Sequence, residues 1–273
     1  MKLLNRGLLA AVLGAVCLTP AIAKNAEDLL HKAQELENAG EYEKAVLLYE
    51  EAGDLGNADA LNNLGIYYLQ GVGVKENFGK AVEFFQAAYQ KGSVDAARSL
   101  GFVYRTGRGV PVDPDKALEY YQVAADHGDA FSQNEMGVIY QAIGTEESYA
   151  KAAALYQKSA NQNNEMALYN LACLYKEGKG VKADLKLHAE LLMKAAKLGF
   201  AYAQHDLAAA YGAGDGVEKN MVEMYAWFTV AGHAMDVSLE YRNMLGSIMS
   251  EEDKAKGLKL GEEYFSQYGS HED

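Results

Sequence analysis

One short pattern recurs five times along the chain and limits what the chain can fold into. Its first clear copy is Leu64-Gly65-Ile66-Tyr67-Tyr68, and the loop Gly71-Val72-Gly73-Val74 follows. The anchor residue of the pattern returns after 36, 36, 35 and 36 residues, at Leu64, Leu100, Met136, Leu171 and Leu207. A fixed period of this size predicts a stack of two-helix units that bury their apolar faces against one another.

Each unit divides into two helical segments joined by a glycine-containing loop. Apolar residues at i, i+4, i+7 and i+8 predict the buried face of the first helix: Ala60, Leu64, Tyr67 and Tyr68. Gly65 lies inside that helix, where glycine costs roughly 1 kcal/mol relative to alanine, and we expect close approach of the second helix to offset this cost. The loop glycines are suited to ending the first helix at positive φ, and Asn77 is expected to cap the second.

Two units and the end of the chain depart from the pattern. The first pair, within 24–57, lacks the loop and has the 34-residue spacing of a tetratricopeptide unit, with a first helix expected from about Ala26 to Asn38. The fourth unit replaces the loop by 143–146, which predicts a looser connection or a different local angle. Beyond 236, Ser250 is expected to cap a last helix whose buried side carries Ala255, Leu258, Leu260 and Tyr264. We predict an all-α solenoid of about six repeats over 24–236 and a helical cap over 237–273.

The first 23 residues read as a separate segment. Lys2 and Arg6 precede an apolar run over 8–18, and Ala21-Ile22-Ala23 provides a small-x-small cleavage pattern. This order is typical of a secretory signal peptide, so the mature chain is expected to begin near Lys24 and to be periplasmic or secreted. An uncleaved anchor or a lipoprotein are the alternatives. No integral membrane segment is expected in the mature chain.

Charge and residue types exclude several classes of function. The chain carries 25 basic and 38 acidic residues, and loss of Lys2 and Arg6 would leave 23 against 38, a formal charge of −15. This balance argues against a nucleic-acid partner, because phosphate binding needs clustered Lys and Arg. Only Cys173 would remain in the mature chain, which excludes an intramolecular disulfide. No catalytic constellation, phosphate loop, metal-ligand spacing or cofactor motif occurs, so we predict a non-enzymatic protein without cofactor or metal.

With these residues in view, the chain resembles the Sel-one-like repeat (SLR) family, whose 36-residue α/α units carry Leu-Gly, Gly-x-Gly-Val and paired aromatic residues. The resemblance covers roughly 26–236 and implies a right-handed superhelix whose concave face binds proteins or peptides. Family members with signal peptides are often envelope adaptors. A cysteine-rich branch has been described as binding penicillin-like compounds, which implies a β-lactam- or peptidoglycan-directed hydrolase as an alternative.

Positions facing the groove of a tetratricopeptide-type repeat form three rows along the first helices. The first row, two residues before the anchor, comprises Asn62, Arg98, Asn134, Tyr169 and His205. The second, two residues after it, comprises Ile66, Phe102, Val138, Cys173 and Ala209. The third, five residues before it, comprises Asp59, Asp95, Phe131, Met166 and Tyr202.

A groove that mixes amides with apolar side chains suits an extended peptide. We therefore predict that a protein or peptide partner binds at Asn62, Ile66, Arg98, Phe102, Phe131, Asn134, Val138, Met166, Tyr169, Tyr202 and His205. The alternative is that the rows only solvate the groove or pack against the next unit. The oligomeric state stays open, and an exported effector remains a third alternative to the adaptor and the hydrolase.

Overall fold

The computed structural model describes residues 20–269, which form fourteen α-helices and contain no strand. This confirms the all-α prediction. The chain divides into two compact units, one up to Val112 and one from Asp113. The helices are α1 Pro20–Asn38, α2 Tyr42–Asp54, α3 Ala58–Gln70, α4 Phe78–Gln90, α5 Val94–Thr106, α6 Pro114–Asp126, α7 Ala130–Ile143, α8 Glu146–Ala160, α9 Glu165–Glu177, α10 Leu185–Lys197, α11 Ala201–Ala213, α12 Met221–Ala231, α13 Asp236–Gly246 and α14 Glu251–Tyr268.

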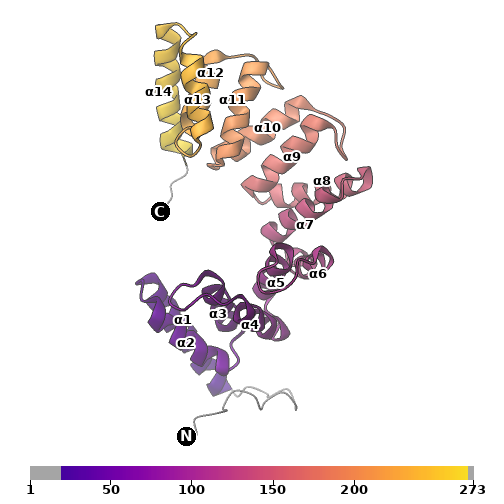
Figure 1. Ribbon diagram of the computed structural model, residues 1–273, viewed down its shortest axis with the longest axis vertical. Coiled ribbons are helices and arrows are strands. Elements are labelled where there is room, and N and C mark those ends of the chain that lie inside the picture. Colours follow the sequence, from indigo (N-terminus) through magenta and orange to yellow (C-terminus); the bar gives the residue numbers. More distant parts are fainter. Residues whose placement is uncertain (1–19, 270–273) are drawn as a thin grey trace. The chain divides into compact units, whose positions relative to one another are not determined.

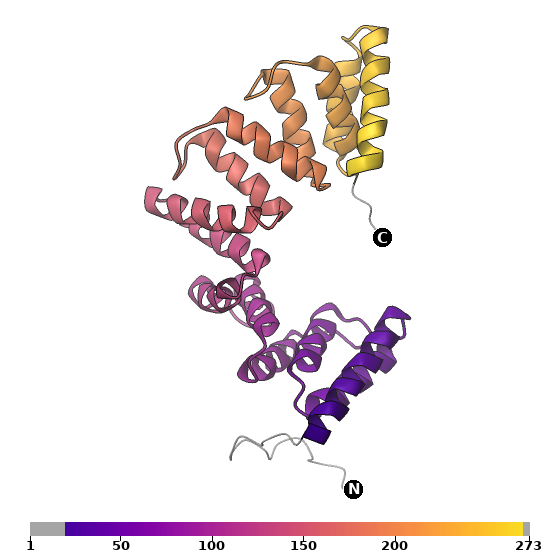
Figure 2. The same cartoon turned by 180° about the vertical axis from the view of Figure 1, so that it is seen from behind.

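Most successive helices pack against one another within each unit, as both views of the ribbon show, whereas α14 packs mainly on α12 (Figures 1 and 2). We call α3, α5, α7, α9 and α11 the A helices, and their partners α4, α6, α8, α10 and α12 the B helices. Each A helix begins one repeat, and each B helix completes it. Small alanines and one large side chain from each B helix fill the core, as with Ala81, Phe85 and Ala88 of α4, which are all fully buried. Trp227 is likewise buried, as its place on the α12 stripe predicts.

The glycine inside the A helix allows the B helix to approach. A Cβ atom at Gly65 would lie 2.3 Å from Cε1 of Phe85, and one at Gly137 would lie 2.5 Å from Cε1 of Tyr156. Real Cβ atoms do not approach ring carbons this closely, so any larger residue would displace a buried ring. The predicted reason for the glycine is therefore confirmed at both positions.

Later repeats vary this contact. The fifth repeat pairs Ala172 with Leu192 at the corresponding positions, so a larger A-helix residue meets a smaller B-helix side chain. The sixth repeat combines Ala208 with Phe228, whose ring stacks on Tyr241 of α13 at a centroid distance of 5.5 Å. The sizes of the A-helix and B-helix side chains at this contact therefore change together from repeat to repeat, as close packing requires.

The second glycine of each loop has a role that the sequence analysis missed. The glycine lies against the first turn of the second helix of the preceding pair. A Cβ atom at Gly73 would lie 2.7 Å from the carbonyl carbon of Tyr42 on α2. A Cβ atom at Gly216 would lie 1.8 Å from the carbonyl oxygen of Leu185 on α10. Gly109 and Gly180 make the same approach to Phe78 and Tyr149. The loop therefore joins neighbouring repeats as well as ending the A helix.

The fourth loop is tighter than predicted. Gly144, at φ +78°, ends α7, and Thr145 caps α8 immediately afterwards. The Thr145 hydroxyl accepts from the backbone N–H of Ser148, and the Ser148 hydroxyl accepts from the backbone N–H of Thr145. This reciprocal capping box satisfies the helix start within two residues, which explains why the connection is short and not loose.

Most helix starts carry side-chain caps, and the cap predicted at Asn77 is confirmed. Asn77 and Asp184 accept the third backbone N–H of α4 and α10 at 3.0 Å, and Asp113 does the same for α6 at 3.1 Å. These side chains satisfy donors that have no partner within the helix.

Replacement of Asp113 by alanine is expected to lower the free energy of unfolding by about 1 kcal/mol, because the N–H of Lys116 loses its side-chain acceptor. Urea denaturation of the full chain measures this loss. Asp113→Asn is the matched control, since asparagine caps equally well and should leave the midpoint near that of the wild type. Equal losses in both variants would contradict the capping role.

The N-terminal helix is longer than predicted. Helix α1 begins at Pro20, whereas the sequence analysis placed its start near Ala26. Ala21, Ile22 and Lys24 are compatible with helix, so nothing between Pro20 and Ala26 ends it. Apart from these first residues of α1, the predicted leader lies outside the described residues.

Helix α14 packs on α12 through glycines, which corrects the predicted stripe. Ala255 and Leu258 are exposed, whereas Gly257 and Gly261 are buried. A Cβ at Gly261 would lie 2.7 Å from Cβ of Thr229, so these two helices approach too closely for larger residues. Glycines four residues apart give a narrow face for close helix packing, a signal that a search for large apolar residues passes over.

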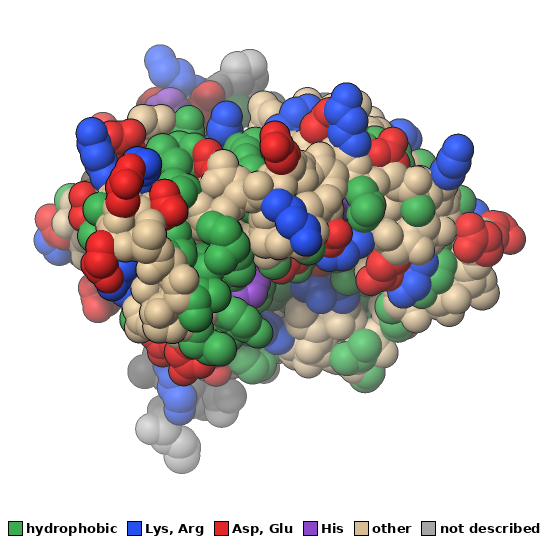
Figure 3. Space-filling view, turned by 90° about the horizontal axis from the view of Figure 1, so that it is seen from above, with side chains coloured by type: hydrophobic (Ala, Val, Ile, Leu, Met, Phe, Trp, Pro, Cys, Tyr) green, Lys and Arg blue, Asp and Glu red, His purple; other side chains and the backbone are tan. Residues whose placement is uncertain are grey.

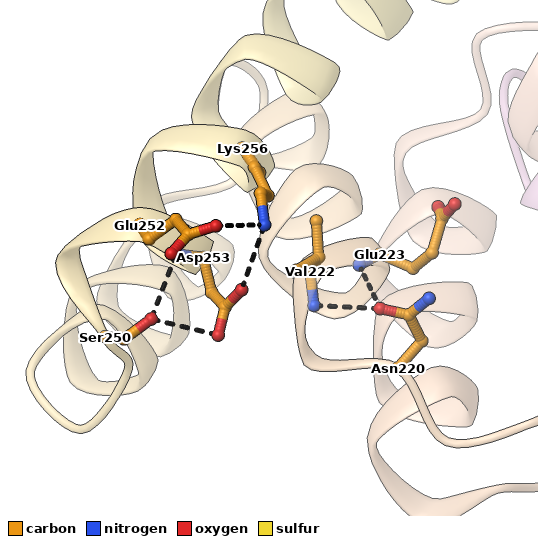
Figure 4. Close-up of polar contacts among 7 residues, drawn as sticks. All are labelled: Asn220, Val222, Glu223, Ser250, Glu252, Asp253 and Lys256. Atoms are coloured by element: carbon orange, nitrogen blue, oxygen red, sulfur yellow. Dashed lines mark hydrogen bonds and ion pairs between the residues drawn. The ribbon is translucent and has the colours of Figure 1, made fainter.

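The starts of α12 and α14 show how each is capped (Figure 4). The Asn220 side chain accepts from the backbone N–H groups of Val222 and Glu223, at 3.0 and 3.1 Å. The Ser250 hydroxyl accepts from the N–H of Asp253 at 3.1 Å, as the sequence analysis predicts. We propose that α13 and α14 cap the stack.

Glu223 on α12 bonds Tyr264 on α14, and we expect the stability of the contact between these two helices to depend on pH. Its carboxylate accepts from the Tyr264 hydroxyl at 3.3 Å, and burial raises its pKa above the ordinary value. A raised pKa favours the protonated form in the folded state, so the stability that this group contributes falls as pH rises through that pKa. Glu223→Gln should therefore raise the unfolding temperature at pH 7, and the gain should shrink toward pH 4. Thermal unfolding measures this, with exposed Glu218→Gln as control.

Candidate partner-binding surface

The first predicted row lies between neighbouring A helices and bonds them together. Asn62 accepts from the Ser99 hydroxyl at 3.1 Å, Asn170 donates to Asn134 at 3.0 Å, and the Tyr169 hydroxyl donates to Asp206 at 3.0 Å. In each pair, the residue two positions before the anchor of one repeat bonds the residue one position before the anchor of the next repeat. Asn62 and Asn134 are buried, so their side chains hold the A helices in register and are not offered to solvent.

The last contact of this kind reaches α13. Nδ1 of His205 lies 2.8 Å from the hydroxyl of Ser238. Ser238 is fully buried, so this serine–histidine pair does not present a nucleophile to a substrate. Arg98 forms an ion pair with Asp95 of the third row at 3.1 Å.

The second row is half-buried along most of its length. Ile66, Phe102, Val138 and Cys173 are all partly covered, and Ala209 is exposed. The guanidinium groups of Arg105 and Arg108 lie over the Phe102 ring, at 5.9 and 5.4 Å from its centroid. Burial and the Asp206 carboxylate raise the pKa of the Cys173 thiol, which keeps it protonated and unsuited to nucleophilic attack.

The third row changes character along the chain. Asp59 and Asp95 are exposed, Phe131 and Met166 are half-buried, and Tyr202 is 57% exposed. Phe131 meets the Tyr121 ring edge-on at 6.4 Å. The exposed aromatic surface of these rows therefore lies in the second unit, on α11.

Tyr202 belongs to a group of three aromatic side chains at the start of α11, and a second aromatic contact lies further along the same helix. Its ring centroid lies 6.3 Å from that of Tyr169 on α9 and 5.6 Å from that of Phe200. One turn further along α11, His205 meets Tyr241 of α13 at 5.6 Å. We call Tyr169, Phe200, Tyr202, His205 and Tyr241 the aromatic cluster. Burial and then Asp206 raise the pKa of Tyr169, so its hydroxyl stays a donor.

Phe200 was missed by the sequence analysis, although the repeat contains a signal for it. It occupies the N-cap position of α11 with φ −73° and ψ 106°, where α3, α5, α7 and α9 begin with Asn57, Ser93, Asp129 and Asn164. Those residues all cap their helices, and Phe200 makes no such bond. A helix that begins without a cap loses about 1 kcal/mol. The sixth repeat therefore has an aromatic side chain where the others have a stabilising cap.

The described residues offer neither a metal site nor a membrane span. Within residues 20–269, no group of three or more His, Cys, Asp and Glu side chains is placed to hold a metal ion. None of the helices over the same range is both long and apolar enough to cross a bilayer. His188 is buried, bonds the carbonyl of Ala172 through Nδ1 at 2.9 Å, and has its pKa lowered by burial, as expected of a structural histidine.

Comparison with known structures supports the same architecture. A protective antigen of uropathogenic Escherichia coli strains, described as displaying an SLR fold, aligns with a TM-score of 0.85 at 29% identity over 91% of this chain. The chain spans 55% of that protein's length. A Sel1 repeat protein from Oxalobacter formigenes aligns with a TM-score of 0.74 at 23% identity, covering 86% of this chain and 99% of the other. No curated protein matches the sequence.

The family comparison agrees with the repeat boundaries. The Sel1 repeat model matches residues 40–57, 58–93, 94–129, 130–164, 165–200 and 201–232. From 58 onward, these matches divide the chain as the A and B helices do, with each repeat beginning at an A helix. The matches extend over most of the chain and include the fourth repeat, despite its shortened loop. The chain belongs to the Sel1 repeat family.

Proposed function

We propose that this protein is an adaptor that binds a protein or peptide partner on the face formed by its A helices. Proteins of the Sel1 repeat family generally mediate protein–protein interaction. Among the residues that the sequence analysis assigned to the groove, the buried amides hold the repeats together. The half-buried and exposed residues of the three rows remain for contact with the partner: Ile66, Phe102, Phe131, Val138, Met166, Tyr169, Tyr202 and His205.

The aromatic cluster is the observation that carries this proposal. Aromatic side chains dominate the energy of protein interfaces because they bury large areas at low conformational cost. Tyr202 is exposed beside Tyr169 and Phe200, and Phe200 occupies a position where a capping residue would stabilise the helix. A side chain that replaces a stabilising residue at a surface is expected to serve binding, since function is often maintained at the expense of stability.

We propose a periplasmic or secreted location for the mature protein. The basic and apolar order of the first 23 residues supports export. The similar E. coli protein is described as a protective antigen. Fractionation of producing cells, with mass determination of the mature N-terminus, tests the proposed start near Lys24.

Phe200→Asn separates binding from stability and is the test of the proposed surface. Asparagine restores the cap found at Asn57 and Asn164, so the variant should unfold at the same urea concentration as the wild type or a higher one. Loss of the ring should weaken partner binding by roughly tenfold, as expected for an interface aromatic. Retention of partners from a cell extract, quantified by mass spectrometry, gives the comparison.

Leu47→Asn is the matched control for this experiment. Leu47 is 63% exposed on α2 and lies in the other unit, far along the chain from the cluster. It should retain every partner at the wild-type level. Equal retention by wild type, Phe200→Asn and Tyr202→Ala would exclude the aromatic cluster as the binding surface.

A further inference from the structure

Helix α13 and the turn that follows it expose a stripe of apolar side chains. Val237, Tyr241 and Met244 follow one another on α13 at spacings of four and three residues, and Ile248 comes in the turn after the helix. The four side chains are 42, 47, 68 and 76% exposed, although one face of the Tyr241 ring stacks on Phe228. Ser238 and Leu245, about a quarter turn around the helix from the stripe, are buried and mark the side that faces the repeats. We call these four exposed residues the α13 stripe.

Exposure of this kind is unusual for large apolar side chains that recur at helical spacing. Solvent-facing helix positions normally carry polar residues, and a continuous apolar stripe marks a face that meets another surface. Hydrophobic side chains gathered beside acidic ones are also seen on the face drawn in the space-filling view (Figure 3). The stripe lies on a helix outside the rows that the sequence analysis assigned to the groove.

Acidic side chains border the stripe on one flank. Asp236 and Glu240 each precede a stripe residue by one position, so both lie along the same side of Val237 and Tyr241. Both are exposed, and within residues 20–269 neither has an ion-pair partner. Just beyond Ile248, the side chain of Glu251 is 91% exposed, with Lys254 at 3.9 Å.

The basic residues near the stripe do not neutralise this flank. Lys256 is held by Glu252 and Asp253 at 2.7 and 3.9 Å (Figure 4). Arg242 lies half-buried on the other flank and donates to Asn243 at 3.0 Å. Asp236 and Glu240 are therefore available to a positively charged partner.

We propose that the α13 stripe docks a basic amphipathic helix of a partner protein. The spacing of four and three residues between Val237, Tyr241 and Met244 is the one at which side chains of two helices interdigitate. The partner would place a matching apolar stripe on Val237, Tyr241, Met244 and Ile248, with Lys or Arg opposite Asp236 and Glu240. Charge complementarity selects this partner over an acidic helix or an anionic membrane surface. The surface is independent of the aromatic-cluster proposal except for Tyr241, which both include.

A designed peptide tests the docking surface. The probe is a fluorescently labelled Leu/Lys peptide of about 18 residues with helical periodicity, long enough to form helix on contact. Its binding to the full chain is followed by fluorescence anisotropy, beside a Leu/Glu peptide of the same pattern. We expect the Leu/Lys peptide to bind at least roughly tenfold more tightly than the Leu/Glu peptide, and increasing salt to weaken it.

Charge-neutral substitutions separate docking from general attraction to an acidic protein. Met244→Gln/Ile248→Gln should lower the affinity for the Leu/Lys peptide by roughly tenfold or more, because the apolar contact is lost while the net charge stays the same. Leu47→Gln, at an exposed apolar position elsewhere, should leave binding unchanged. Phe200→Asn should also leave it unchanged, so failure of the aromatic-cluster proposal and failure of this one are distinguishable. Because the substituted side chains are exposed, thermal unfolding should stay at the wild-type temperature.

Three outcomes would overturn the proposal. The first is equal affinity of wild type and Met244→Gln/Ile248→Gln for the Leu/Lys peptide. The second is a wild-type dimer in light scattering that this variant converts to a monomer, which would assign the stripe to a second copy of the chain. The third is co-sedimentation of the wild type, but not the variant, with phosphatidylcholine vesicles, which would assign it to a lipid surface.

Discussion

Gly216→Ala is expected to lower the free energy of unfolding by about 2 to 5 kcal/mol, a large part of the stability of an ordinary domain. Two effects combine in this loss. Gly216 has φ +75°, a conformation that costs an L-residue about 1 to 2 kcal/mol. A Cβ atom there would also lie 1.8 Å from the carbonyl oxygen of Leu185, so the loop must move away from α10. Such displacement in a packed region costs about 1 to 3 kcal/mol.

Gly128→Ala isolates the inter-repeat contact from the backbone effect. Gly128 has φ +90°, and nothing lies within 4 Å of the Cβ position. Only the backbone conformation should then be penalised, by about 1 to 2 kcal/mol. Urea denaturation of both variants measures the difference. Equal losses would mean that the loop glycine serves only to end the A helix and does not join neighbouring repeats.

Gly65→Ala is expected to destabilise the first unit by about 1 to 3 kcal/mol, although alanine favours helix. The added methyl group would overlap the Phe85 ring, and that ring is fully buried without space to move. Gly79→Ala is the control within the same unit: Gly79 also lies in a helix, but its Cβ would meet only Asn77 Oδ1, at 3.4 Å. That substitution should leave stability unchanged or raise it by up to about 1 kcal/mol.

A compensating substitution tests the mechanism of the Gly65 effect. The fifth repeat uses Ala172 with Leu192 at the same two positions, so Gly65→Ala/Phe85→Leu reproduces a pair that the protein already contains. The double variant should lose less stability than the sum of the single losses, with a coupling of about 0.5 to 3 kcal/mol. Additive losses would contradict direct overlap between the methyl group and the ring.

The repeat made the local part of the fold predictable. The anchors, the glycine inside the A helix and the caps at Asn77, Asp113 and Asp184 all depend on contacts within one repeat or on the period itself. These contacts recur with the same residue types, so one copy confirms another. The all-helical, repeated architecture and the reason for Gly65 could therefore be predicted before the structure.

Contacts between repeats were less accessible to sequence reasoning. The second loop glycine meets the backbone of the preceding repeat, and backbone atoms carry no residue identity that a pattern can reveal. Gly257 and Gly261 form a helix contact through the lack of side chains, so a search for large apolar positions favoured Leu258 in error. The fourth loop was predicted to be loose because the capping box of Thr145 and Ser148 was not recognised.

The candidate surface could be predicted only in part. Positions relative to the anchor placed Tyr169, Tyr202 and His205 on the A helices, but they did not separate buried from exposed rows. Asn62 and Asn134 have residue types typical of binding sites, yet each bonds the next A helix. Phe200 occupies the position at which four other repeats have a capping residue. Comparing the residues at this position in all repeats would have identified Phe200 as a candidate.

Site-specific photo-crosslinking in intact producing cells tests the central claim most directly, namely that the A-helix face binds the partner. A photoreactive phenylalanine is placed at Tyr202 and Ala209 on α11, and at the exposed B-helix positions Lys158 and Lys194. Illumination should give the same partner adduct from Tyr202 and Ala209 and none from Lys158 and Lys194. Adducts from the B-helix positions, with none from α11, would contradict the account.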